Sequence, residues 1–252
     1  SINTPTGGAG GYTYNWTPGN PTGDGTTSVT GLSAGTWSCT ITDANSCTGT
    51  QTFNITQPGA ISITPASQTN VSCNGSSNGA ASINTPTGGA GGYTYNWTPG
   101  NPTGDGTTSV TGLTAGTWTC TVTDANTCSK SQTFTITQPT AISSTTVVTN
   151  VSCNGGSNGA INLTPTGGTP GYTFNWGGGV TTEDRTGLIA GSYTYTITDA
   201  NGCTNISSVS VTEPSAIATT TSITNILCNG GSTGSATLTS SGGTSPYTYL
   251  WS

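Results

Sequence analysis

A stretch of 32 residues occurs twice in this chain, letter for letter: Ser1–Leu32 is repeated as Ser82–Leu113. An aromatic motif recurs at steps of 81, 79 and 75 residues, centred on Trp16, Trp97, Trp176 and Trp251. A period of this length is too long for one turn of a solenoid and fits a small domain. Near-identical copies are poorly suited to forming one unique active site. They are well suited to adding length and to presenting one surface many times.

Charged residues are almost absent, and this limits the classes of partner. Only 4% of the residues are charged, the formal net charge is −6, and there is no histidine, whereas an average globular protein is about 25% charged. The chain therefore lacks the basic patch that nucleic acids or anionic membranes require. No apolar run approaches the roughly 20 residues of a membrane span. Six tryptophans and nine tyrosines argue against disorder.

Alternation of apolar and polar residues predicts short strands throughout each repeat. In the third repeat the expected strands are Ile142–Val151, Ala160–Thr164, Tyr172–Trp176, Val180–Thr182, Ser192–Asp199 and Thr204–Thr212. About six short strands in roughly 75 residues are typical of an antiparallel immunoglobulin-like β-sandwich. We therefore predict an all-β fold of tandem sandwiches. The expected ranges are a partial first repeat at 1–58, whole second and third repeats at 59–139 and 140–214, and a partial fourth repeat at 215–252.

Two cysteines recur in each whole repeat. One opens a Cys-Asn-Gly turn, here called the CNG turn, and the other follows an Asp-Ala-Asn turn, here called the DAN turn. Cys153 and Cys203 are the only cysteines of the third repeat, so we predict that they pair, and alignment predicts Cys73 with Cys128. Each bond would close a loop of about 50 residues, which stabilises by on the order of 4 kcal/mol. Disulfides indicate an oxidising, extracytoplasmic compartment.

Four further cysteines do not fit a complete pair. Cys47 and Cys228 correspond to members of such pairs, and their partners are expected outside this sequence. Cys39 and Cys120 stand where the third repeat has Tyr195. Alternation places Cys120 on the expected core face, so we expect buried free thiols rather than cross-links between copies.

Two aromatic rows are candidates for stacking on sugar rings. Each row has residues at i, i+2 and i+4 of one strand and so shares one face: Tyr93, Tyr95 and Trp97, and Tyr172, Phe174 and Trp176. A sandwich also needs bulky residues on its inner face, and few others are available. We therefore favour the core for these rows over a carbohydrate site.

Catalytic and metal-binding patterns are weak. Asp43, Asp124 and Asp199 recur in the DAN turns, where such residues usually bond their own backbone, and too few acids accompany them for a calcium site. Without histidine there is no base to activate a serine or cysteine. The adjacent acids Glu183 and Asp184 have no counterpart in the second repeat. We predict a protein that is not an enzyme and needs no cofactor or metal.

Three motifs together resemble a known family. They are CNGG(S/T)xG, GGxxxYTYxW and GLxAGxYTxTxTDANGC, and each recurs along the chain in the same or an altered form. The first and second copies depart from the pattern at the WTPGNPTGDG loop and at the extra cysteine. This pattern is similar to the SprB repeats, which occur in tandem in very large cell-surface proteins of Bacteroidota, including a gliding-motility adhesin. The resemblance implies surface display, export by the type IX secretion route, and adhesion or filament building. The strands also resemble the polycystic-kidney-disease (PKD) class of immunoglobulin-like domains.

Repetition and resemblance together predict a structural or adhesive segment of an extracellular, surface-anchored fibre. Prolines in the linkers at Gln57–Gly59, Gln138–Thr140 and Glu213–Ser215 would stiffen the joints. The expected partners are a surface polysaccharide or another adhesive substrate, and also a second copy of the chain through lateral contacts. One alternative is an array of carbohydrate-binding modules on a secreted polysaccharide-degrading protein. Another is a self-assembling filament subunit.

Overall fold

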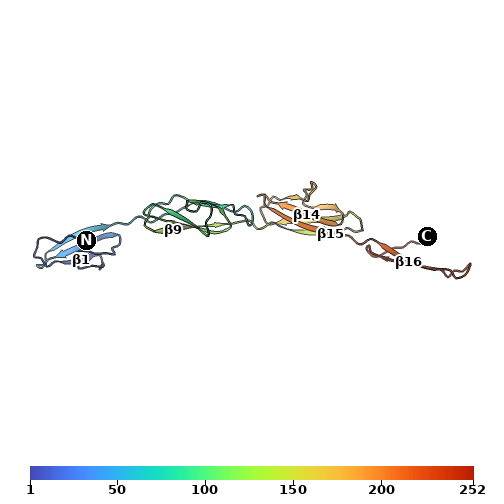
Figure 1. Ribbon diagram of the computed structural model, residues 1–252, viewed down its shortest axis with the longest axis horizontal. Coiled ribbons are helices and arrows are strands. Elements are labelled where there is room, and N and C mark those ends of the chain that lie inside the picture. The colour runs from blue at the N-terminus through green and yellow to red at the C-terminus, as the bar shows by residue number, and fades with distance from the viewer. The chain divides into compact units, whose positions relative to one another are not determined.

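Every regular element of the protein is a β-strand, in a computed structural model that describes residues 1–252 (Figure 1). No helix long and apolar enough to cross a membrane occurs in it. The first nine strands are β1 (Thr13–Thr17), β2 (Gly35–Thr42), β3 (Thr48–Ile55), β4 (Pro65–Thr69), β5 (Gly79–Ile83), β6 (Thr94–Thr98), β7 (Ser109–Leu113), β8 (Gly116–Thr123) and β9 (Ser129–Ile136). The other eight are β10 (Ser143–Thr149), β11 (Gly159–Thr166), β12 (Thr173–Asn175), β13 (Arg185–Leu188), β14 (Gly191–Thr198), β15 (Thr204–Val211), β16 (Ala218–Thr224) and β17 (Ser235–Ser241). The predicted all-β class is confirmed.

Each whole repeat contains two three-stranded sheets, and the strands pair antiparallel in β4-β5-β7 and in both sheets of the third repeat. The second repeat has the orders β4-β5-β7 and β6-β8-β9, and the third has β10-β11-β13 and β12-β14-β15. The first repeat contributes one sheet, β1-β2-β3, and the fourth contributes the pair β16-β17. The fold is therefore of the immunoglobulin-like class, as the alternation predicts.

Contacts between Cα atoms group the chain into two compact units. One comprises residues 1–63, 85–94 and 122–130, and the other comprises residues 64–84, 95–121 and 131–252. The third repeat, the CNG turn of the second repeat and the linker between them all belong to the latter unit.

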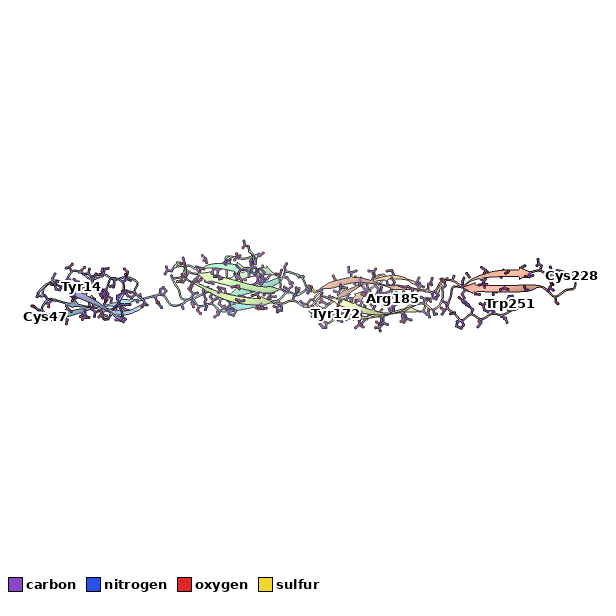
Figure 2. The ribbon with its side chains drawn as sticks, turned by 90° about the horizontal axis from the view of Figure 1, so that it is seen from below. Tyr14, Cys47, Tyr172, Arg185, Cys228 and Trp251 are labelled. Carbon is purple, nitrogen blue, oxygen red and sulfur yellow. A yellow bond between two sulfur atoms is a disulfide. The ribbon has the colours of Figure 1, made fainter.

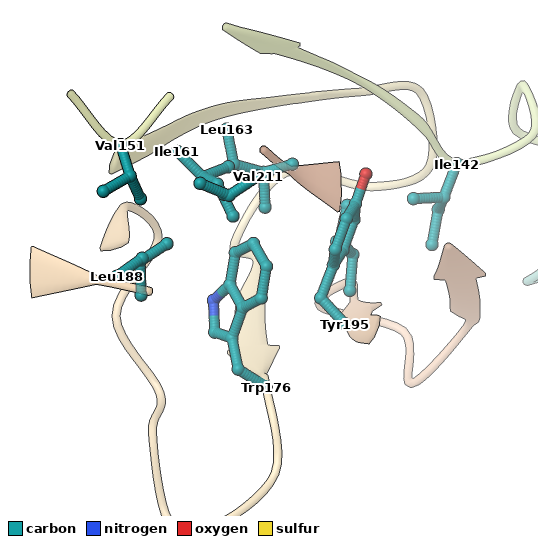
Figure 3. Packing of buried hydrophobic residues seen from close by; sticks show 9 residues of the cluster. Ile142, Val151, Ile161, Leu163, Trp176, Leu188, Tyr195 and Val211 are labelled. Carbon is teal, nitrogen blue, oxygen red and sulfur yellow. The ribbon is translucent and has the colours of Figure 1, made fainter. Parts of the chain in front are cut away.

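Nine buried side chains form the core of the third repeat (Figure 3). They come from both sheets and from the segments that flank them: Ile142, Val151, Ile161, Leu163, Trp176, Leu188, Tyr195, Ile197 and Val211. Alternate residues of β11 and β14 point into this cluster, so the period of two in the sequence becomes the inner face of a sandwich.

A glycine at the start of β11 is required by close packing. The register of β11 on β13 shifts between Gly159 and Ala160. A Cβ atom on Gly159 would lie 2.8 Å from Val211 Cγ1 and 2.9 Å from the Leu188 carbonyl oxygen. The equivalent Gly79 is crowded in the same way, so both bulges leave no room for a side chain.

The extra cysteines make room for an aromatic ring. In the third repeat the Tyr195 ring lies 4.7 Å from the Trp176 ring, measured between centroids. In the second repeat Cys120 replaces this tyrosine, and Phe134 packs on Trp97 from β9 at 5.5 Å. The third repeat has valine at the position of Phe134. The pairs Cys–Phe and Tyr–Val are therefore two ways of placing one ring against the core tryptophan.

One detail of the predicted third repeat is wrong. Val180–Thr182 is a loop rather than a strand, because the Val180 N–H donates to the Gly177 carbonyl in a tight turn. The strand at this place is β13, which begins at Arg185. In β15, Ile206 is 69% exposed, because it lies on the opposite face of the strand from the inward-facing Val209 and Val211.

Candidate functional site

The tryptophans of the two aromatic rows lie inside the protein. Trp97 has no exposed surface and Trp176 is 8% exposed. Each indole N–H donates at 2.9 Å to a backbone carbonyl, of Thr107 and Thr182 respectively. Neither ring is available to stack on a sugar.

The remaining members of the rows are half-buried: Tyr93, Tyr95, Tyr172 and Phe174. The hydroxyls of Tyr93 and Tyr172 each donate to a glycine carbonyl five residues earlier, Gly88 and Gly167. Figure 2 labels Tyr172 on the side-chain view of the molecule. These tyrosines therefore brace their own loops.

Arg185, the single arginine of the chain, covers the third repeat's aromatic face. Its guanidinium carbon lies 5.7 Å from the Trp176 ring centroid and 5.3 Å from that of Tyr193. Such cation–π contacts contribute roughly 0.5–1 kcal/mol at exposed sites. The contact further closes this edge of the core to a ligand.

The loop carboxylates act as acceptors for backbone N–H groups. Asp105 Oδ1 accepts from the Trp97 N–H at 2.8 Å, and Asp24 does the same for Trp16 at 2.9 Å. Asp184 Oδ1 accepts from the Leu163 N–H at 2.9 Å. Histidine, cysteine, aspartate and glutamate side chains form no cluster of three or more that could hold a metal. These acids hold backbone N–H groups of the strands in place.

The DAN turn is built around its aspartate. Asp199 Oδ1 accepts from the N–H groups of Asn201 and Cys203, both at 2.9 Å, and Oδ2 accepts from the Thr169 N–H at 2.8 Å. These bonds, the Thr169 one above all, hold the pKa of the Asp199 carboxyl below its usual value. Asp124 makes the same three contacts in the second repeat. The cysteine after the turn is thereby fixed in place.

The CNG turn is tied to the linker that leaves its own repeat. In the second repeat the Gly75 N–H donates to Gln138 Oε1 at 2.8 Å, and Asn74 Nδ2 donates to the Pro139 carbonyl at 3.0 Å. In the third repeat Glu213 takes the glutamine's role and accepts from Gly155 at 2.7 Å. The sequence alone did not predict these hydrogen bonds between the CNG turn and the linker. The recurrence of Gln-Pro or Glu-Pro after the last strand of each repeat is the signal that could have found them.

A disulfide joins the second repeat to the third. Cys73 of the CNG turn bonds Cys203 of the DAN turn, with 5.6 Å between the Cα atoms and 130 residues between the two along the sequence. Asn201 Nδ2 donates to the Ser72 carbonyl at 3.0 Å beside the bond. A closed loop of 130 residues stabilises the fold by about 5 kcal/mol in the chain-entropy model. A cleft of about 430 Å³ lies next to it, lined by Cys73, Asn74, Pro139, Ile142, Asp199 and Cys203, among others.

The predicted pairs Cys73–Cys128 and Cys153–Cys203 are therefore wrong, and strand geometry gives the reason. Cys203 directly precedes β15, whereas the turn of Cys153 is bonded to Glu213 just after that strand. Eight strand residues separate the two ends by about 25 Å. Disulfides require Cα atoms within about 7 Å. Cys153 and Cys203 thus lie at opposite ends of the third repeat.

The other six cysteines carry free thiols. Cys39 and Cys120 are completely buried, and burial raises the pKa of Cys120 to about 11 and that of Cys39 above its usual value. They are thus protonated and inert at neutral pH. The exposed ones are Cys47, Cys128, Cys153 and Cys228, and Figure 2 labels Cys47 and Cys228.

A protein-family model described as SprB repeat matches residues 65–102, 145–181 and 220–252. The chain matches the SprB repeat family at these three places. Each match begins at or within the first strand of a repeat (β4, β10 or β16) and runs through the CNG turn to the aromatic motif that ends in tryptophan. The family resemblance of the motifs is therefore confirmed. No curated protein matches the chain in sequence.

A comparison with solved structures finds several that are similar to this chain at low sequence identity. The eight N-terminal Ig domains of the Down syndrome cell adhesion molecule are 10% identical, with a TM-score of 0.39 over 80% of this chain and 32% of that one. The human desmocollin-1 ectodomain is 13% identical, with a TM-score of 0.33 over 71% and 44%. Protocadherin gammaB7 EC3-6 is 15% identical, with a TM-score of 0.33 over 89% and 72%. This chain spans about a third of the first structure and less than half of the second.

Proposed function

We propose that this SprB-repeat chain is a load-bearing, adhesive segment of an extracellular or surface-anchored fibre. The observation that carries the proposal is the disulfide between Cys73 and Cys203, which joins two successive repeats. A covalent bond across a joint serves a protein that must transmit force along its length. It also requires an oxidising compartment, which supports a location outside the cytoplasm.

The repeat architecture supports attachment through many equal contacts. Ser1–Leu32 and Ser82–Leu113 are identical, so any surface that one of them presents, the other presents as well. Linked copies of a weak binder hold a substrate far more firmly than one copy, provided that the spacing allows simultaneous contact. The partner we propose is a surface polysaccharide or another adhesive substrate. Export by the type IX route and a role in gliding rest on the family resemblance.

Removing one repeat tests the multivalent part of the proposal. Deletion of Gly59–Pro139 from the displayed protein removes one period and leaves neighbouring repeats in phase. Attachment of cells to a polysaccharide-coated surface should then weaken only in proportion to the repeats lost. Complete loss of attachment, with export and folding intact, would show that the deleted repeat carries a private site and would contradict the proposal.

Carbohydrate binding by the aromatic rows is the competing function, and the burial of Trp97 and Trp176 argues against it. The half-buried Tyr95 offers a direct check, because leucine at this position stays apolar and removes the aromatic ring. A Tyr95→Leu variant should attach like the unmodified chain. A large loss of polysaccharide binding, with unchanged thermal stability, would favour the carbohydrate-binding module instead.

A further inference from the structure

We propose that the exposed cysteines of this chain are half-sites for further disulfides between successive repeats. The rule is directional: the CNG-turn cysteine of one repeat bonds the DAN-turn cysteine of the next. Cys73 and Cys203 form one such bond. By the same rule, Cys153 forms a disulfide with the DAN-turn cysteine of a repeat that follows it. Cys128 forms a disulfide with the CNG-turn cysteine of a repeat that precedes it. The inference stands independently of the adhesive role.

The surroundings of Cys153 reproduce those of the bonded Cys73. Its neighbour Gly155 donates to the Glu213 carboxylate at 2.7 Å, as Gly75 donates to Gln138 at 2.8 Å. The backbone N–H groups of the preceding serines, Ser152 and Ser72, each donate at 3.0 Å to the side-chain Oδ1 atom of the asparagine six residues later. The turn that holds Cys73 for bonding is therefore already formed around Cys153, whose thiol is exposed.

The surroundings of Cys128 reproduce those of the bonded Cys203. Both backbone N–H groups donate at 2.9 Å to the Oδ1 atom of a turn aspartate, Asp124 or Asp199. A second carboxylate oxygen anchors each turn to the preceding glycine-rich loop at 2.8 Å. Cys47 is held in the same way by Asp43 at 2.9 Å. Each thiol thus sits in the geometry that supports a disulfide elsewhere in the same chain.

Bond formation needs an oxidant, and we name a small-molecule or enzyme-bound disulfide. The Cys153 thiolate attacks one sulfur of that disulfide and releases one thiol, which leaves a mixed disulfide. The DAN-turn thiolate of the next repeat then attacks the Cys153 sulfur and releases the second thiol. Two protein thiols are oxidised to one disulfide, and the oxidant is reduced to two thiols, so atoms and electrons balance.

Under this rule the sequence ranges closed by successive disulfides overlap, and this limits how far force can extend the chain. The Cys73–Cys203 bond spans residues 73–203, and a bond from Cys153 would begin inside that span. Along the shortest covalent path, Cys73 leads directly to Cys203, and Cys228 lies only 25 residues further on. An array linked in this way leaves little chain that force could draw out.

An extended chain tests the rule for Cys153. Repeating residues 178–214 after Ser252 completes the fourth repeat and supplies a copy of Cys203. The extended chain is oxidised with glutathione disulfide, alkylated and cut with trypsin, which cleaves only after Lys130, Arg185 and the repeated arginine. We expect the fragment 131–185, which holds Cys153, to be joined to the C-terminal fragment. A Cys153→Ser variant should lose this link alone, and a Cys228→Ser variant should keep it.

Pairing of Cys228 with the added cysteine, or a free Cys153 in the oxidised extended chain, would overturn the rule. The unmodified chain provides a second arm that does not depend on the extension folding. At high concentration with glutathione disulfide, cross-links between chains should join Cys153 or Cys228 to Cys47 or Cys128. Links between two CNG-turn cysteines, or between two DAN-turn cysteines, would overturn the rule as well. Cross-links whose yield rises with protein concentration join two separate chains. Cross-links whose yield does not depend on concentration join two repeats of the same chain.

Discussion

Pulling the chain from its two ends should reveal a single long segment locked by one disulfide. With Cys73 bonded to Cys203, the 130 residues between them cannot extend. Force should therefore draw out only residues 1–73 and 203–252, an extension of about 430 Å at roughly 3.5 Å per residue. Reduction of the bond should then add about 450 Å in one step. Single-molecule force spectroscopy with and without a thiol reductant measures both lengths.

Matched variants make this measurement decisive. Cys73→Ser should remove the reductant-dependent step, and Cys128→Ser should retain it, since Cys128 is free and exposed. Bonds within each repeat would instead lock loops of 55 and 50 residues. Reduction would then release two separate steps of about 190 and 175 Å. That result would refute the joint between repeats.

Three further predictions concern the core and the turns. Cys120→Tyr should destabilise the fold by about 1–3 kcal/mol through overpacking. Adding Phe134→Val should recover about 1 kcal/mol or more, because only one ring then packs against Trp97. Chemical denaturation of both single variants and the double variant measures this coupling, and additive effects of the two substitutions would contradict it. Asp199→Asn should lower the melting temperature most at neutral pH. Backbone hydrogen bonds lower the pKa of Asp199 in the folded protein. The stabilisation by its carboxylate is therefore present above the unfolded pKa of about 3.9 and is lost as the pH falls through the folded pKa. A difference in melting temperature between the two proteins that does not shrink in acid would argue against this role. Trp251 is 65% exposed and Trp97 is buried. Trp251→Phe should therefore remove much of the fluorescence that acrylamide quenches and leave blue-shifted emission. Strong acrylamide quenching of the remaining emission would contradict the burial of the tryptophans in the two aromatic rows.

The strands of this fold could be predicted because their residues carry the signal locally. In β14 the residues Tyr193, Tyr195 and Ile197 alternate with threonines, and Tyr195 and Ile197 are buried in the core. The strand β13 was missed because Arg185–Leu188 holds one arginine, one glycine and a single buried leucine, which give no alternation. A four-residue strand of this kind is defined by its pairing with β11 rather than by its own residues.

The disulfide could not be predicted from cysteine positions alone. Counting cysteines between Pro139 and Pro214 treats a repeat as a closed unit, and Cys153 and Cys203 then have no other partner. The count omits the length of β15, which separates the two thiols, and the clamp from Glu213, which turns Cys153 toward the exit of its repeat. Both facts belong to three-dimensional structure. Only the recurrence of Gln-Pro and Glu-Pro hinted at them in the sequence.

The bond between successive repeats can be tested most directly by tryptic mapping of the unreduced chain. Its two basic residues, Lys130 and Arg185, give three fragments: 1–130, 131–185 and 186–252. With free thiols alkylated beforehand, the structure predicts that 1–130 and 186–252 migrate as one linked species and that 131–185 migrates alone. A link between 131–185 and 186–252, with 1–130 free, would mean that Cys153 pairs with Cys203 or Cys228 and that Cys73 does not bond Cys203, and would contradict the account.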